Sequence, residues 1–113
     1  MTWEITQADR AGWQRQAALE LAAILDDCDG LPLIAWTVGP SGGALCGRVT
    51  GPVAAAGICG AFTAWRRALG MDDVLETAVA GGTWLRARSW RGGVRVTVTA
   101  TVPAGDGDED VLS

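Results

Sequence analysis

The feature that most constrains the fold is the segment 83–102, where polar and apolar residues alternate on both sides of a glycine pair. Gly92 and Gly93 suit the two-residue primed turns that β-hairpins prefer, because glycine adopts positive φ without a steric penalty. From Val94 to Val102, valine, or alanine at position 100, alternates with arginine or threonine. This period of two is typical of a strand with one buried face. We therefore expect a hairpin at the centre of a sheet.

The length of the turn fixes the register of this hairpin. One face would pair Trp90 with Arg95, Arg88 with Thr97, Arg86 with Thr99 and Trp84 with Thr101. The opposite face would pair Ser89 with Val96, Ala87 with Val98 and Leu85 with Ala100. The second face is small and apolar, as a core requires. A slip of one residue would turn the valines out to solvent, so the pattern strongly favours this register.

Helical periodicity precedes the sheet. Thr6 followed by Asp9 predicts a helix start, with a hydroxyl cap and a carboxylate near the positive end of the dipole. Apolar residues then recur at helical spacing as far as Cys28, and Gly30 is expected to end the helix. The carboxylates of the last turn lack the spacing of a calcium loop, so a solvated helix end is expected there. These are Asp26, Asp27 and Asp29.

The middle of the chain predicts a second hairpin and a second helix. Residues 31–38 and 44–50 form two mostly apolar runs joined by a glycine-rich turn at 39–43. We expect Cys46 on the same face as Trp36. Proline in the pair Gly51-Pro52 suits the first turn of a helix, and large apolar residues follow at helical spacing. These are Ile58, Phe62, Trp65 and Leu69.

Residues 73–80 fit two structures. Asp73 with Glu76 could form a capping box for a short helix, whereas the β-branched content and the following Gly81-Gly82 turn favour a strand. We prefer the strand. The expected order is then α-β-β-α-β-β-β, most simply an antiparallel sheet of about five strands with two helices packed on one face.

Length and charge predict a single domain. The chain has 113 residues, and we expect residues 1–105 to form one soluble α+β domain and residues 106–113 an acidic flexible tail. The net charge is −4, but four of the 13 acidic residues lie in that tail, against nine arginines in the rest of the chain. The body is thus near neutral, and nothing global points to a polyanionic partner.

Absent residue types limit the chemistry and indicate an origin. The chain has no His or Lys, which removes the commonest general base and the Schiff-base nucleophile. We expect no enzyme, no cofactor and no metal site.

All nine basic residues are Arg, and Tyr and Asn are also missing. This bias is typical of a GC-rich bacterium or of its phages and mobile elements.

The cysteines and the first residues indicate the cytoplasm. Cys28, Cys46 and Cys59 are widely spaced and form no C-x-x-C pair, so reduced, buried thiols are expected. Residues 1–4 lack the basic region and the apolar run of a signal peptide. No uninterrupted apolar run approaches the length of a membrane span. We expect a cytoplasmic protein that does not enter a membrane.

One face of the central hairpin is the candidate functional site. It carries Trp84, Arg86, Arg88, Trp90 and Arg95. Arginines lying over the indole rings would give an ordinary exposed sheet face. Trp and Arg are also enriched at protein–protein hot spots, and aromatics with cations on a sheet bind single-stranded nucleic acid.

The leading hypothesis is a small non-catalytic protein-interaction module whose partner is another protein or a second copy of the chain. The alternative is a single-stranded nucleic-acid binder that uses the same face. A third hypothesis is an enzyme or small-ligand carrier with its pocket between the second helix and the sheet, which would require a large apolar cavity.

Overall fold

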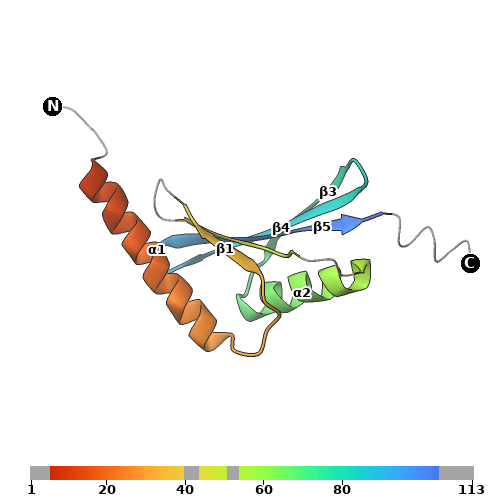
Figure 1. Cartoon of the computed structure of the whole chain (residues 1–113), viewed down its shortest axis with the longest axis horizontal. Helices are drawn as coiled ribbons and strands as arrows, with labels where there is room; N and C mark the ends of the chain where they lie inside the picture. The colour runs from red at the N-terminus through yellow and green to blue at the C-terminus, as the bar shows by residue number, and fades with distance from the viewer. Residues whose placement is uncertain (1–5, 40–43, 51–53, 105–113) are drawn as a thin grey trace, which may run out of the picture.

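The fold combines two helices with one five-stranded sheet, so the predicted α+β class and element order are confirmed. It is seen in a computed structural model that describes residues 6–39, 44–50 and 54–104. The elements, in chain order, are α1 (Gln7–Asp27), β1 (Ala35–Val38), β2 (Ala44–Arg48), α2 (Ala55–Ala68), β3 (Asp73–Val79), β4 (Gly82–Arg91) and β5 (Val94–Pro103) (Figure 1). The ambiguous segment is thus a strand, β3. The glycine-rich turn from residue 40, the Gly51-Pro52 helix opening, the acidic tail and residues 1–4 lie outside the described residues.

The sheet is mixed, and the predicted purely antiparallel arrangement is wrong. The strand order is β1-β2-β5-β4-β3, and β2 pairs with β5 in parallel. The helix α2 connects β2 to the far edge strand β3, a helical crossover of the kind that joins strands of the same direction. Two antiparallel hairpins then lead from β3 through β4 to β5, so β5 runs in the same direction as β3 and β2.

The central hairpin has the predicted register. Trp90 lies opposite Arg95, and the ladder continues through Arg88 with Thr97 to Trp84 with Thr101. Gly92 and Gly93 have φ values of 58° and 80°, as a primed turn requires. The alternation is confirmed on the core face, where side chains of the two strands are buried. These are Leu85, Ala87, Val94, Val96, Val98 and Ala100.

The first hairpin forms as predicted, but with a different pairing of its faces. Trp36 lies opposite Gly47, and Cys46 lies opposite Thr37, so Cys46 is on the face away from Trp36. The expectation that Cys46 shares a face with Trp36 is therefore wrong. A Cβ atom at position 47 would lie 2.7 Å from Ile34 Cδ1 and 3.0 Å from the Trp36 ring. Glycine is needed there because the indole occupies the space of a side chain.

The buried core contains residues of the sheet and of both helices. Ile58, Phe62 and Trp65 of α2 are buried, and α2 contacts β5. The helix α1 contributes Ala17 and Ile24 and contacts β1, β2 and β5. Burial of such apolar side chains stabilises the fold by about 1.5–3 kcal/mol for each large residue.

The helix α1 begins as predicted and is attached to the sheet by its second half. Thr6 and Asp9 form a capping box, each side chain bonding to the other's backbone N–H at 3.1 Å. The first half of the helix runs beyond the sheet (Figure 1), and Trp13 is 40% exposed. Of the helices in the described parts of the chain, none combines the length and apolarity that crossing a membrane requires.

Candidate binding face of the sheet

The structure places all five predicted site residues on one face. Residues directly opposite each other in antiparallel strands point to the same side, so the register puts them together with the threonines of β5. We call this side of the sheet the outer face. Its hairpin members are Trp84, Arg86, Arg88, Trp90, Arg95, Thr97, Thr99 and Thr101, and β3 adds Asp73, Leu75, Thr77 and Val79.

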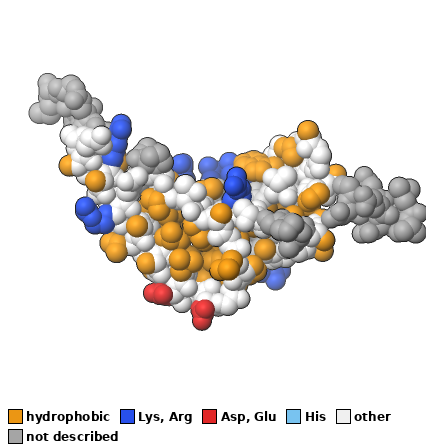
Figure 2. Space-filling model, viewed as in Figure 1, with side chains coloured by type: hydrophobic (Ala, Val, Ile, Leu, Met, Phe, Trp, Pro, Cys, Tyr) orange, Lys and Arg blue, Asp and Glu red, His pale blue; other side chains and the backbone are white. Residues whose placement is uncertain are grey.

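A fourth arginine joins this face from β2. Arg48 lies opposite Thr99, and Thr99 lies opposite Arg86, so the three residues form a row across the middle of the sheet. The sequence does not predict Arg48 on this face, because its place depends on the parallel pairing of β2 with β5. No turn or spacing in the sequence encodes this pairing. In Figure 2, several arginine side chains lie along the upper middle of the molecule, while others lie at its left and lower right.

The outer face carries more positive than negative charge. Its arginines are Arg48, Arg86, Arg88 and Arg95, against the single carboxylate of Asp73. Both Nε and Nη2 of Arg88 donate to Oδ2 of Asp73, at 3.0 and 2.8 Å. The side chains of this pair are 39% and 53% exposed, and pairs this open contribute no more than about 1 kcal/mol. Among the described residues, the other three arginines have no ion-pair partner.

Arg86 holds a hydrogen-bond donor without an acceptor. Its Nε atom is buried and has no hydrogen-bond partner among the described residues. A buried donor that stays unpaired costs about 1–3 kcal/mol. A carboxylate or phosphate arriving from outside could remove part of that cost by accepting this hydrogen bond. Arg86 is therefore the strongest anion-binding candidate on the face.

The two tryptophans differ in exposure. Trp90 is 72% exposed, whereas Trp84 is half-buried. A depression of about 330 Å³ lies beside Trp90, between β3 and the turn of the central hairpin. It is lined by Asp73, Arg88, Ser89, Trp90 and Arg95. An indole beside two guanidinium groups offers an apolar surface and forked donors at one place.

The edge strand β3 extends the face with apolar side chains. All seven of its residues are exposed. Leu75 and Val79 point to the outer side, at 40% and 41% exposure. Leu75 lies opposite Arg86, so it places an apolar side chain at the end of the row that Arg48, Thr99 and Arg86 form.

The carboxylates at the acidic end of α1 are exposed to solvent, as predicted, and Asp27 also forms an ion pair. Arg91 of β4 bonds through Nη2 to Asp27 and through Nε to Glu20 at 3.2 Å. This arginine follows the outer-face residues in sequence but turns to the helix instead. Within the described ranges, no three His, Cys, Asp or Glu side chains come together as a metal-ion site would need.

The cysteines are free thiols, but the prediction that they are buried is wrong. Cys46 and Cys59 are exposed, and Cys28 is half-buried. Cys46 is exposed because it lies on the outer side of β2, and Cys59 is exposed at the side of α2 where a pocket opens toward the sheet. Burial raises the pKa of the Cys28 thiol, and nearby Arg91 only partly offsets this effect.

Comparison with known proteins leaves this face as the main guide to function. The chain matches no family model, and neither the curated proteins nor the solved structures include one with significant similarity to it.

Proposed function

We propose that the protein is a non-catalytic interaction module that binds an acidic segment of a partner protein on the outer face. In this proposal both helices pack on the core side of the sheet, which leaves the outer face open for a partner. The proposal keeps the sequence-based expectations of a cytoplasmic accessory protein of bacterial or phage origin that needs no cofactor.

One observation carries the proposal: the outer face joins unpaired arginines to exposed aromatic and aliphatic side chains. Arg86 offers a buried donor without an acceptor, and Trp90, four residues along β4 on the same face, is 72% exposed. Interfaces combine such anchors, with Trp and Arg enriched among the residues that dominate binding energy. Arginine binds carboxylates through paired hydrogen bonds, so an acidic partner suits the charge of the face.

A protein partner fits this face better than a nucleic acid. The exposed Leu75 and Val79 continue the face with apolar surface that a phosphate backbone would not use. The whole chain carries a net charge of −4, which opposes the approach of a polyanion. Trp84 and Trp90 nevertheless provide planar rings beside arginines, so single-stranded nucleic acid is the second candidate.

A second copy of the chain is one form that the acidic partner could take. Residues 106–110 have the sequence Asp-Gly-Asp-Glu-Asp, which supplies four carboxylates. The outer face offers four arginines against one aspartate. Opposite charges of similar size would allow this segment of one copy to bind the face of another.

The test compares charge reversal on the face with the same charge change elsewhere. The face variant is Arg86→Glu/Arg88→Glu, and the control is Arg10→Glu/Arg15→Glu on the exposed first half of α1. Each is titrated with a fluorescent peptide that alternates Glu and Leu, and with a mixed-sequence single-stranded oligonucleotide. Sedimentation of the same samples reports self-association. A variant with Asp106, Asp108, Glu109 and Asp110 replaced by amides removes competition from the chain's own acidic segment.

The proposal predicts that the parent protein binds the peptide. The affinity for the peptide should fall about tenfold or more in the face variant and stay unchanged in the control. Dimers that disappear in both the face variant and the amide variant would identify the second copy as the partner. Stronger binding of the oligonucleotide, lost in the face variant and steeply reduced by salt, would promote the nucleic-acid candidate. If all variants are monomeric and bind neither probe, the proposal is wrong.

A further inference from the structure

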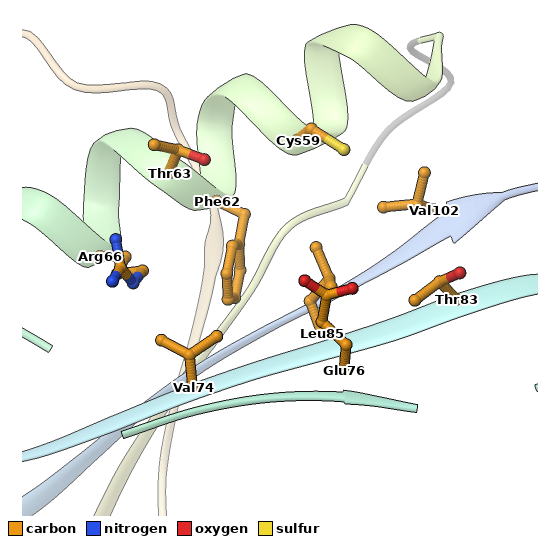
Figure 3. Close-up of a pocket in the computed structure, with 9 residues that line it drawn as sticks. All are labelled: Cys59, Phe62, Thr63, Arg66, Val74, Glu76, Thr83, Leu85 and Val102. Carbon is orange, nitrogen blue, oxygen red and sulfur yellow. The ribbon is translucent and has the colours of Figure 1, made fainter. Parts of the chain in front are cut away.

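A pocket lies on the core side of the sheet, away from the outer face. It has a volume of about 450 Å³ and opens between α2 and the end of the sheet formed by β3, β4 and β5. Small-molecule sites commonly have volumes of about 300–1,000 Å³. The lining residues, shown in Figure 3, are Cys59, Phe62, Thr63, Arg66, Val74, Glu76, Thr83, Leu85 and Val102.

The pocket exists because the sheet extends beyond the cover that α2 provides. Phe62 points from the helix toward the sheet, and Val74 points from β3 toward the helix (Figure 3). Phe62 and Leu85 are buried, whereas Val74 is 37% exposed. The inner end of the pocket is therefore closed and apolar, while the side formed by β3 remains open to water.

Arg66 adds a cation to this apolar site. It lines the pocket from α2, and its Nε atom is buried without a hydrogen-bond acceptor among the described residues. A guanidinium group binds a carboxylate through strong, directional hydrogen bonds. An anionic group in the pocket would accept the hydrogen bond that the described residues leave unmade.

Glu76 stands on the opposite wall. It is an exposed residue of β3, and in Figure 3 its carboxylate points toward α2. Glu76 and Arg66 form no ion pair, although both line the same pocket. The arginine is therefore left available to an incoming anion, and Glu76 opposes that anion only through water-screened repulsion.

We infer that this pocket binds a small amphipathic carboxylate. The carboxylate group lies on Arg66, and the apolar body lies against Phe62, Leu85 and Val102. This site is separate from the outer face, so it does not depend on the proposed function. It would make the protein a carrier or a sensor of the ligand.

The experiment titrates the full chain with octanoate, below its micelle concentration, and with octanol as the neutral probe of equal length. Calorimetry gives the affinity, and NMR of the methyl groups locates the site. Saturable octanoate binding that shifts the methyl signals of Val74, Leu85 and Val102 is expected. Octanoate should also slow alkylation of Cys59 at the pocket while leaving Cys46 on the outer face unaffected.

Variants separate the charge of Arg66 from the folding of the chain. Arg66→Gln should lower the affinity for octanoate about tenfold or more and leave the affinity for octanol nearly unchanged. Arg67→Gln is the matched control, because Arg67 is exposed on the same helix turn and does not line the pocket. Glu76→Gln should raise the affinity for octanoate about threefold, since the substitution removes a charge of the same sign as the ligand. Thermal unfolding of each variant confirms that it is folded.

Three results would overturn the inference. They are the absence of saturable octanoate binding, an equal loss in Arg66→Gln and Arg67→Gln, and methyl shifts confined to residues outside the pocket. None of these results bears on peptide binding at the outer face. Conversely, the Arg86→Glu/Arg88→Glu variant should bind octanoate as the parent does. The pocket and the outer face can therefore be tested independently of each other.

Discussion

The indole Nε1–H of Trp65 donates a 2.7 Å hydrogen bond to the backbone carbonyl oxygen of Pro32. Trp65 lies in α2, and Pro32 lies in the connection between α1 and β1. The Trp65 ring also packs edge-on against Trp36 of β1, with 5.5 Å between ring centroids. One buried side chain thus joins α2 to the connection and to an edge strand.

Replacing Trp65 by Phe should destabilise the protein by about 1–3 kcal/mol. The change removes a hydrogen bond, leaves the Pro32 carbonyl without its donor and opens space in the core. Urea unfolding measures the free energy of unfolding of the variant and of the parent. Trp90→Phe is the control, because a side chain that is 72% exposed should change stability by no more than about 0.5 kcal/mol. Equal effects of the two variants would contradict this role of Trp65.

Gly47→Ala and Gly60→Ala should have opposite effects. A Cβ at position 47 meets Ile34 Cδ1 at 2.7 Å, whereas a Cβ at position 60 meets nothing within 4 Å. Overpacking should cost about 1–3 kcal/mol at position 47. At position 60, inside α2, alanine should stabilise by about 0.5–1 kcal/mol. Differential scanning calorimetry would show the melting temperatures moving in opposite directions, and a shift in the same direction would disprove the packing described for Trp36.

Arg91→Gln should loosen the second half of α1 while leaving the sheet intact. Arg91 connects the end of β4 to Glu20 and Asp27 of that helix. These ion pairs are partly exposed, so the free energy of unfolding should fall by no more than about 1 kcal/mol. Amide hydrogen exchange should quicken in α1 around Ile24 and stay unchanged in β5. Equal rates of amide exchange in α1 of the variant and of the parent would show that Arg91 does not hold the helix.

The free energy of unfolding should fall as the pH rises above 9. Burial raises the folded-state pKa of the Cys28 thiol above its ordinary value of 9.0, against the smaller lowering effect of Arg91. The unfolded chain therefore releases this proton first, and further alkali favours unfolding. The sequence contains no Lys or Tyr that would titrate in the same range. Urea unfolding at several pH values should show a flatter profile for Cys28→Ser, and an unchanged slope would contradict the assignment.

Local patterns predicted the parts of the fold that depend on neighbours in the chain. The Gly92-Gly93 pair and the alternating valines determine the β4–β5 register, since turn geometry and burial favour the same pairing. Thr6 and Asp9 predicted the helix start for a similar reason. Because the predicted site residues all belong to this one hairpin, their common face followed directly from its register.

Distant relationships were beyond the reach of these patterns. The parallel contact of β2 with β5 depends on where α2 carries the chain, and the spacing of residues does not encode that path. The sequence therefore predicts neither the place of Arg48 nor the mixed character of the sheet. A pocket between α2 and the sheet belongs only to the third of the sequence-based hypotheses, and Arg66 is not predicted to line it, because the pocket depends on how far β3 extends beyond the cover of α2.

The central position of β5 has a consequence for how the chain is made. Its neighbour β2 is synthesised before α2, β3 and β4, and β5, which joins the first hairpin to the rest of the sheet, follows only after all of them. Until then, β1 and β2 form only an isolated hairpin, which is marginally stable in water. Closing so long a loop slows folding. The nascent chain thus presents the apolar side of its first hairpin, including Trp36, to the folding machinery of the cell before the sheet can close.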